Sequence, residues 1–451
     1  MRKRIRLIIL LSCVALFLIF APYIVLYSMG YRVDFVKMKI TATGGIYIRT
    51  SPQASAIIID SKINTKPGMF ANSVFVQDLL AKEHYVLIKK DGYYDYNKIL
   101  PVRENQVTKL ENVLLIKQNI VFNLLSEKTD YFSISPDGKN ILLAGPAPKA
   151  IGFEYFTLSN PNQKMNYSLP LQNAEVSDIK WSDNSSVALI KIQNMAAISY
   201  YIFDSSKTIQ QTAALPYLDK NSQQTSFDPR DIQQLFYVEN KTLYSLKNNK
   251  VAAVIDNLIA YKIYNGNILW LSSDGFLSQS DTSGKLTQKL TAKKIATDLN
   301  KNYQILIIAG KTFLKENGAL YLLNPDTKIF ENFNVPITDY EILPSPDNKN
   351  LLLKNSDQIY LYSFADLPAQ AGKKYENMFS GSRITDYYWL NNDYIVFTAE
   401  GKIIISEIDY RGNINSVALE NENSKIFFNR PDGKLYTLTN STLFSSEKIT
   451  P

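Results

Sequence analysis

The chain has 451 residues, which exceeds the usual size of a single hydrophobic core, so two or more domains are expected. Apolar residues make up 45% of it and aromatic residues 12%, enough for packed cores and too much for long disorder. The formal charge is +7, but most of it lies before residue 40, and the remainder of the chain is nearly neutral. A basic surface for DNA or RNA is therefore not indicated, and we expect no nucleic-acid partner.

A membrane-spanning segment is predicted near the start of the chain. An uncharged run, residues 7–27, begins at Leu7 and ends at Tyr27. A helix of that length spans roughly 30 Å, the thickness of the hydrocarbon core of a bilayer. Arg2, Lys3, Arg4 and Arg6 precede the run, which favours a cytoplasmic tail at residues 1–6 and places the later domains outside. We expect an uncleaved signal anchor and a single-pass cell-membrane protein.

Two other interpretations of this segment stay open. A cleaved signal peptide would have a shorter apolar core and a small-residue cleavage site, and residues 27–31 offer no convincing one. A lipoprotein could use Cys13, but strongly apolar residues would then follow the lipidated cysteine. Pro22 is expected to kink the helix at most, since neighbouring groups can satisfy the freed carbonyl.

Residues 28–43 are expected to form a short stalk, and residues 44–116 a small antiparallel β-sandwich. Alternating apolar and polar residues, with turn signals every ten residues or so, support the sandwich. The expected strands are residues 46–52, 56–60, 84–90, 99–103 and 109–116, and residues 64–67 are expected to form a turn.

This segment resembles the PEGA domain, a small β-module of cell surfaces. The matching stretches are Gly45-Ile46-Tyr47-Ile48, Ser51-Pro52, Ala56-Ile57-Ile58-Ile59-Asp60, Thr65-Lys66-Pro67, Tyr85-Val86-Leu87-Ile88 and Lys90-Asp91-Gly92-Tyr93. Ser61 replaces a glycine that is usual in the family, and Lys82-Glu83 replaces its Pro-Gly. The resemblance implies a noncatalytic extracellular module between a membrane anchor and a larger domain.

Residues 117–451 are expected to form a β-propeller, so the fold class is all-β. The clearest unit is residues 131–143, where Pro136-Asp137-Gly138 forms a tight turn between two strands. Eight such units recur with a period near 40 residues, which is typical of propeller blades. The units start near Tyr131, Val176, Phe227, Tyr261, Asp298, Leu343, Tyr387 and Lys425. A spare strand at residues 118–125 could complete the short last unit, and seven blades remain open if the fourth or eighth unit is not separate.

The recurring Ser-Pro-Asp turn followed by an apolar strand resembles TolB-like and WD40-like β-propellers. The Trp-Asp and Gly-His signatures of true WD40 repeats are absent, which favours the TolB-like type. The resemblance implies a rigid binding platform in a bacterial cell-envelope protein. Trp181, Trp270 and Trp389 fall at comparable points in three units; packing between sheets is the expected role, with an aromatic lining for a glycan or peptide as the alternative.

No catalytic, cofactor or metal site is expected. His84 is the only histidine, and nothing near it has the spacing of metal ligands, so we expect a surface position on a strand. The single cysteine excludes intramolecular disulfides and thiol redox pairs. Five acids lie in the turns between repeat strands, where carboxylates serve ordinary turn chemistry: Asp137, Asp183, Asp228, Asp347 and Asp432. A calcium ion or a catalytic pair among them is the less favoured interpretation.

These observations favour a noncatalytic, membrane-anchored extracytoplasmic binding or scaffold protein. Its propeller would recognise an envelope protein, a peptide or a surface polymer, through residues that the sequence does not identify. The main alternative is an exported propeller enzyme that acts on glycans as a lyase or hydrolase. That enzyme would show carboxylates with an Arg or Tyr converging on the central channel. A purely structural role in holding envelope layers together is a third hypothesis, since fold does not decide function.

Overall fold

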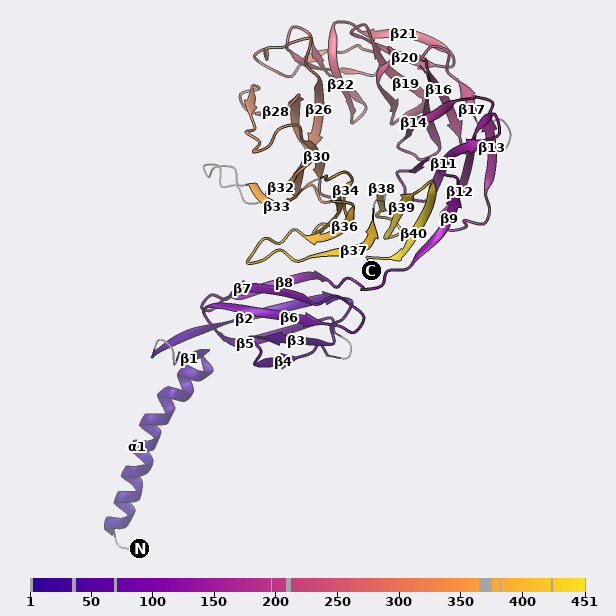
Figure 1. Ribbon diagram of the computed structural model, residues 1–451. Helices are drawn as coiled ribbons and strands as arrows, with labels where there is room; N and C mark the ends of the chain where they lie inside the picture. The colour runs from indigo at the N-terminus through magenta and orange to yellow at the C-terminus, as the bar shows by residue number, and fades with distance from the viewer. Residues whose placement is uncertain are drawn as a thin grey trace.

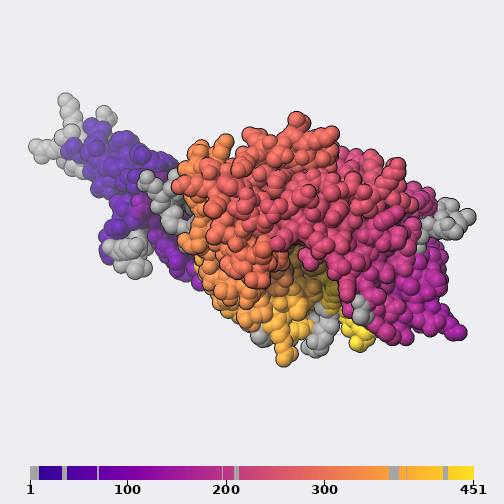
Figure 2. All heavy atoms as spheres, turned by 90° about the horizontal axis from the view of Figure 1, so that it is seen from above, coloured from indigo at the N-terminus to yellow at the C-terminus, as the bar shows by residue number. Residues whose placement is uncertain are grey.

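The chain forms an N-terminal helix, a small module of two packed sheets and a ring of further sheets (Figure 1). The computed structural model describes residues 3–34, 38–68, 71–195, 197–207, 212–364, 375–381, 383–422 and 425–450. The helix and module project from one side of the ring, and the third to fifth sheets, magenta to orange, lie on the opposite side (Figures 1 and 2).

Helix α1 (Lys3–Ser28) contains Pro22 without being interrupted by it. Its part Leu10–Ser28 has a mean hydropathy of 2.4 and is not buried against the rest of the protein. By length and composition this is the one helix of the described residues that could cross a membrane. Gly30, with φ +84°, follows the helix and turns the chain into the first strand.

The module consists of two four-stranded sheets around one apolar core. One sheet contains β1 (Tyr31–Asp34), β2 (Lys39–Ser51), β5 (Ser73–Leu80) and β8 (Val107–Leu114); the other contains β4 (Ile63–Thr65), β3 (Ala56–Ile59), β6 (Glu83–Lys89) and β7 (Tyr96–Pro101). Ile46 and Ile48 of β2 pack against Ile57 and Val86 of the facing sheet, and all four are fully buried. The period-2 alternation of these strands places every second residue in this core.

Three details of the module differ from the sequence-based expectation. Within the expected stalk (28–43), β1 pairs with residues 39–42 of β2, so these residues extend a sheet of the module. Strand β8 runs parallel to β2, so the module is not purely antiparallel. Residues 63–65 form β4 where a turn was expected, and β5 was not foreseen. A register shift in the pairing of β2 with β5 interrupts the simple alternation that would have revealed this strand.

After residue 117, the described strands form eight four-stranded antiparallel sheets, numbered here 1 to 8. Sheets 1 to 4 contain β10 (Tyr131–Ile134), β11 (Asn140–Ala147), β12 (Ala150–Thr157), β13 (Met165–Leu169); β14 (Ala174–Trp181), β15 (Val187–Asn194), β16 (Ala197–Asp204), β17 (Thr212–Ala214); β18 (Gln223–Asp228), β19 (Asp231–Glu239), β20 (Thr242–Lys247), β21 (Lys250–Ile255); and β22 (Leu258–Tyr264), β23 (Asn267–Ser272), β24 (Leu277–Asp281), β25 (Gln288–Lys289).

Sheets 5 to 8 follow in the same order along the chain. They contain β26 (Tyr303–Ile308), β27 (Lys311–Glu316), β28 (Ala319–Leu323), β29 (Phe330–Asn332); β30 (Glu341–Pro344), β31 (Asn350–Lys354), β32 (Gln358–Ser363), β33 (Tyr375–Ser380); β34 (Tyr387–Trp389), β35 (Tyr394–Ala399), β36 (Lys402–Glu407), β37 (Ser416–Glu422); and β38 (Lys425–Asn429), β39 (Lys434–Thr439), β40 (Thr442–Lys448), β9 (Phe122–Glu127).

The sheets close into a ring because each one packs on its neighbours. Every adjacent pair shares a buried apolar cluster, and the last sheet packs on the first. Strand β9, from the segment expected to supply a spare strand, pairs with β40 and so joins the beginning of the ring to its end. The first strand of each sheet lies innermost (Figure 1). Sheets arranged radially in this way form a β-propeller.

Candidate functional site: the junction of the module and the ring

The junction begins with an unusual residue in an ordinary strand. Strand β7 alternates buried and exposed residues, and its buried positions are Tyr96, Lys98 and Leu100. Tyr96 and Leu100 belong to the core of the module. Lys98 therefore occupies an inward position where an apolar residue is usual, and its side chain is 0% exposed. A buried ammonium must be paired and fully hydrogen-bonded to be tolerated.

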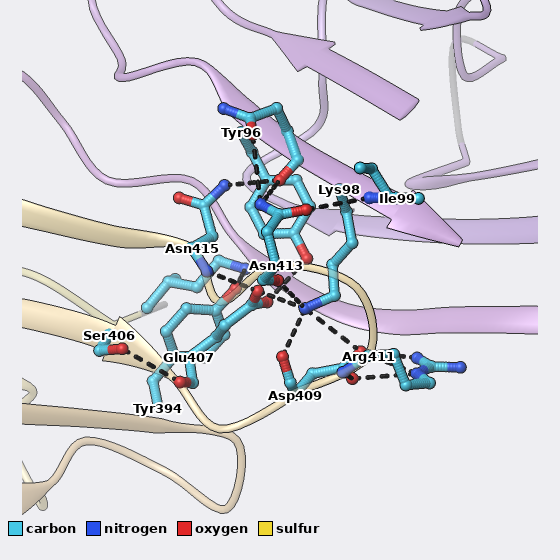
Figure 3. Close-up of polar contacts among 12 residues, drawn as sticks. Tyr96, Lys98, Ile99, Tyr394, Ser406, Glu407, Asp409, Arg411, Asn413 and Asn415 are labelled. Atoms are coloured by element: carbon cyan, nitrogen blue, oxygen red, sulfur yellow. Dashed lines mark hydrogen bonds and ion pairs between the residues drawn. The ribbon is translucent and has the colours of Figure 1, made fainter. Parts of the chain in front are cut away.

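The end of β36 and the loop between β36 and β37 supply the partners of Lys98. Nζ of Lys98 lies 2.5 Å from Oε1 of Glu407 and donates to the carbonyl oxygens of Asp409 at 2.5 Å and Asn413 at 2.9 Å (Figure 3). These three acceptors match the three protons of an ammonium. All three acceptors come from sheet 7, so the ammonium group of Lys98, which belongs to the module, is hydrogen-bonded entirely by the ring.

Glu407, at the end of β36, is the centre of the network. Its Oε2 accepts a hydrogen bond of 2.7 Å from the Tyr96 hydroxyl, and its Oε1 accepts one of 2.8 Å from the Asn415 amide. Burial raises the pKa of Glu407, against the opposing influence of Lys98, Tyr96 and Asn415. The carboxyl group is thus held by both parts of the protein in a solvent-poor position.

The pKa of Asp409, two residues after Glu407, is shifted in the opposite direction. Burial opposes its ionisation, but Arg411 and Lys98 hold its pKa below the ordinary value. Arg411 donates from Nη2 to Asp409 at 2.6 Å and to the carbonyl oxygen of Lys109 at 2.9 Å. This paired arginine therefore extends the contact from β7 to β8.

The same loop also covers the free edge of β7. The side-chain amide of Asn413 accepts from the Ile99 amide at 3.0 Å and donates to the Asn97 carbonyl at 2.9 Å. Asn415 donates to the same carbonyl at 3.1 Å. Gly412 has φ +64°, and a Cβ there would lie 2.3 Å from the carbonyl oxygen of Ile99. Only glycine allows the loop to approach the strand this closely.

An apolar contact accompanies the polar one. Leu114, the last residue of β8, and Ile116 belong to the buried cluster between sheets 7 and 8. The Leu114 amide donates to the hydroxyl of Tyr394 at 3.0 Å. Just after β8, Lys117 pairs with Glu447 at 2.8 Å. Burial, charge and hydrogen bonding therefore all fix one orientation of the module on the ring.

At its other end the module contacts α1 through one arginine. Arg32 in β1 donates from Nη1 to the Tyr27 carbonyl at 2.8 Å, and its guanidinium carbon lies 3.5 Å from the centre of the Tyr27 ring. Nη2 forms an ion pair of 2.8 Å with Asp78 of β5. The arginine thus connects the last turn of the helix to a strand of the module, in the manner expected of cations at helix C-termini.

The prediction that His84 lies on the surface is wrong. It is 3% exposed, and its Nδ1 and Nε2 lie 2.8 Å from Oδ2 of Asp60 and from the Leu80 carbonyl oxygen. Burial opposes ionisation of Asp60, but the Tyr85 amide, His84 and Lys82 hold its pKa below the ordinary value. The pair ties the β3–β4 turn to β6, and in the described residues no group of three or more His, Cys, Asp or Glu could hold a metal ion.

Two of the three tryptophans play equivalent parts, and the third does not. Trp181 and Trp389 lie on the first strands of sheets 2 and 7, and each Nε1 donates at 3.2 Å to the first strand of the preceding sheet, to Ser133 Oγ and the Leu343 carbonyl. Trp270 lies on a second strand, β23, and its Nε1 is buried without a hydrogen-bond partner among the described residues.

The turn acids perform turn chemistry at four of the five predicted positions. Asp137 and Asp347 accept from Ser135 and Ser345 at 2.6 and 2.7 Å, and the other two, Asp228 and Asp432, accept a backbone amide two residues later. In the second unit Asn184 takes this role instead of Asp183, because it accepts from Ser182 at 2.8 Å.

A second group of polar residues lies near the inner side of the ring, at sheets 6 to 8. Asp386 precedes β34 and accepts from the Ile426 amide of β38 at 3.2 Å. Burial raises the pKa of Asp386, against the influence of Ile426, Lys425 and Lys354. Glu341 raises it further and lies 3.6 Å from Lys354. Tyrosines 387 and 388 follow Asp386 directly, so carboxylates and phenols do meet here.

Sequence reasoning missed the junction residues Lys98 and Glu407. A lysine between two buried residues of an alternating strand was the available signal, since charged residues are almost never fully buried unless they are paired. The partner could not be found in the same way, because it is more than 300 residues away.

Comparison with known proteins agrees with the two-part organisation. The PEGA domain family matches residues 43–118, which confirms the predicted resemblance of the module. No curated protein matches the chain.

Several solved structures resemble the chain. The β-propeller domain of Cps50 (Swd1) from Myceliophteria thermophila has 10% identity and a TM-score of 0.42, covering 73% of this chain and 98% of that one. BamB from Moraxella catarrhalis has 13% identity and a TM-score of 0.45, with coverages of 72% and 98%. The computationally designed Ika8 protein has 10% identity and a TM-score of 0.46, with coverages of 71% and 96%. Likeness at this level has no bearing on function. The chain thus contains a PEGA domain next to a ring of β-sheets.

Proposed function

We propose that this chain is a noncatalytic, membrane-anchored scaffold of the bacterial cell envelope whose propeller recognises an envelope protein, peptide or surface polymer. In this proposal residues 1–6 are a cytoplasmic tail, residues 7–27 cross the membrane, and residues 44–116 are a β-sandwich that holds the propeller outside. Each of the eight sheets is one blade of a TolB-like propeller.

The observation that carries the proposal is the buried junction. A flexible tether would need neither the Lys98–Glu407 pair nor the apolar contact of Leu114 and Ile116 with sheets 7 and 8. A buried ion pair is costly to assemble, and its best-attested benefit is to specify one arrangement. A propeller held in one orientation on its module is the geometry of a platform that presents a fixed surface to its partner.

The test uses the full chain in lipid nanodiscs and three fractions of bacterial envelope: wall polymer, lipid vesicles and detergent-solubilised membrane protein. Saturable retention of one fraction supports recognition and identifies the class of partner. Equal, non-saturable retention of all three fractions contradicts the proposal.

A second candidate function is glycan cleavage, because Asp386 offers a carboxyl with a raised pKa near Glu341 and two tyrosines. Perturbed carboxyls of this kind occur at catalytic sites as well as in structural networks. Release of soluble fragments from the wall polymer, abolished in Asp386→Asn and kept in the exposed turn variant Asp326→Asn, would establish the enzyme. Without any release by the wild-type protein, this candidate fails.

A further inference from the structure

A hollow of about 760 Å³ lies on the inner side of the ring. Its lining comes mainly from the first strands of sheets 2 to 5, which are β14, β18, β22 and β26. This part of the ring is opposite the PEGA domain (Figures 1 and 2). The volume is that of a typical binding site for a small molecule or a peptide segment.

Each of the four strands contributes one exposed, long polar side chain to the lining. In order around the ring these are Lys180, Gln224, Lys262 and Gln304. The wall therefore alternates an ammonium with a carboxamide, and Asp183 is the one carboxylate among the lining residues. Such a surface offers hydrogen bonds in both directions and an excess of positive charge.

Two of these side chains are already engaged within the ring. Lys180 Nζ lies 3.4 Å from the Thr225 hydroxyl and 3.8 Å from the Asp178 carboxylate. Gln224 donates to the Ile259 carbonyl at 3.2 Å. Within the described part of the chain, neither Lys262 nor Gln304 has a side-chain hydrogen bond or ion pair. Of the two lysines on this wall, Lys262 is therefore the one without a side-chain partner among the described residues.

The backbone of the same strands is also available for binding. Each first strand pairs only with the second strand of its own sheet in the described structure, so its inner edge is open. An open strand edge can accept an extended peptide through main-chain hydrogen bonds.

The aromatic residues of the lining do not provide a sugar platform. Trp181 donates to Ser133 and makes a perpendicular ring contact with Phe203. Phe227 packs against the buried cluster between sheets 2 and 3. Tyr261 and Tyr303 are buried, and their hydroxyls are bonded to Gln224 and to Glu316. Exposed ring faces are what glycan sites use for stacking, so the hollow suits a peptide better than a glycan.

We propose that the hollow binds an extended peptide segment whose carboxylate pairs with Lys262. This inference rests on the proposed recognition function and names its ligand class and its binding site. The peptide backbone lies along the inner strand edges, and Gln304 and Gln224 contact its amides. The carboxylate belongs either to an acidic side chain or to the C-terminus of the segment.

The test measures fluorescence anisotropy of labelled peptide pools with the full chain in nanodiscs. The pools are random short peptides with a central Glu or a central Gln, each made as free acid and as C-terminal amide. We expect the carboxylate-bearing pools to bind about tenfold more tightly than the amidated Gln pool, the effect of one charge-assisted hydrogen bond. The Glu amide and the Gln free acid distinguish the two sources of the carboxylate.

The substitution Lys262→Gln should remove this preference, because it deletes the charge and leaves a polar side chain that is shorter by one bond. Lys250→Gln, on the outermost strand of sheet 3, is the matched control and should keep it. An equal affinity for all pools, or a preference that survives Lys262→Gln, overturns the inference. If an envelope fraction is nevertheless retained saturably, the recognition function stands and only the proposed binding site is wrong. If nothing is retained, the recognition function and the peptide site both fail.

Discussion

The two ends of the PEGA domain are attached in physically different ways. At the ring, Lys98 is 0% exposed and Glu407 is 4% exposed, and each makes several hydrogen bonds across the contact. At the helix, Arg32 is 19% exposed and its partner Asp78 is 49% exposed. At the ring, the cation and the carboxylate come from the two parts that they join, and both are buried. At the helix, Arg32 and Asp78 both belong to the PEGA domain, and only Arg32 reaches the helix, through the carbonyl and the ring of Tyr27.

The burial of an ion pair determines how strongly it fixes the relative orientation of the parts that it joins. Removing one member of a buried pair leaves an unpaired charge and costs about 3–5 kcal/mol, whereas an exposed pair contributes about 0–1 kcal/mol. The PEGA domain and the ring should therefore behave as one body, and motion relative to the membrane should occur at Arg32. The four predictions below test this contrast, from the largest expected effect to the smallest.

Lys98→Met should have the largest effect, lowering the free energy of unfolding by about 3–5 kcal/mol because Glu407 is left buried and unpaired. Denaturant unfolding, monitored by hydrogen exchange, should show two separate transitions, one for the PEGA domain and one for the ring. The control is Lys109→Met, whose side chain is 65% exposed and should change little.

The double variant Lys98→Met, Glu407→Leu should recover much of the loss, since an apolar pair can replace a buried ion pair. If the single and double variants are equally unstable, the unpaired charge is not the cause.

Gly412→Ala should cost about 2–4 kcal/mol, because the new Cβ meets the Ile99 carbonyl oxygen in addition to the strain of a positive φ. Gly310→Ala is the matched control: it also has a positive φ, of +71°, but nothing lies within 4 Å of its Cβ. It should lose only about 1 kcal/mol. Thermal unfolding of both variants measures the difference, and equal losses would show that the loop is not pressed against β7.

Glu407 and Asp60 should respond to pH in opposite directions. The raised pKa of Glu407 means that its contribution to stability is present below about pH 4.3 and is lost as the pH rises through the raised value. The lowered pKa of Asp60 means that its contribution is present above about pH 3.9 and is lost as the pH falls through the lowered value.

The measurement is the unfolding midpoint of the wild type relative to Glu407→Gln and to Asp60→Asn across this acidic range. The wild type should lose stability relative to Glu407→Gln with rising pH, and relative to Asp60→Asn with falling pH. Slopes of the same sign for the two comparisons would contradict the assignment.

Arg32→Gln should have the smallest effect on stability, at most about 1 kcal/mol, because the pair with Asp78 is partly exposed. Its effect should instead be on geometry. Spin labels on α1 and on β6 should show a broader distance distribution by pulsed electron resonance, while a pair on β6 and sheet 7 keeps its distribution. Broadening of both pairs would show that the two attachments are not independent.

Local patterns predicted the elements of this protein well where each element carries its own signal. The Ser-Pro-Asp turn is an example, because Ser135 and Asp137 bond to each other within the turn. The pattern failed where a distant segment decides the environment. His84 was expected at the surface, but Asp60 and the end of β5 enclose it. Lys98 could be noticed from the alternation of β7, but its meaning depended on a loop far along the chain.

The sequence by itself determined the apolar helix, the PEGA resemblance and the repeating strands, because hydrophobic period and turn chemistry act between residues near one another. Only the tertiary structure showed that the expected spare strand does close the ring, where the PEGA domain sits and which lysine is buried. Those features arise from contacts between distant residues, such as Lys98 with Glu407, and β9 with β40. Their energies depend on burial, which exists only once the chain has folded.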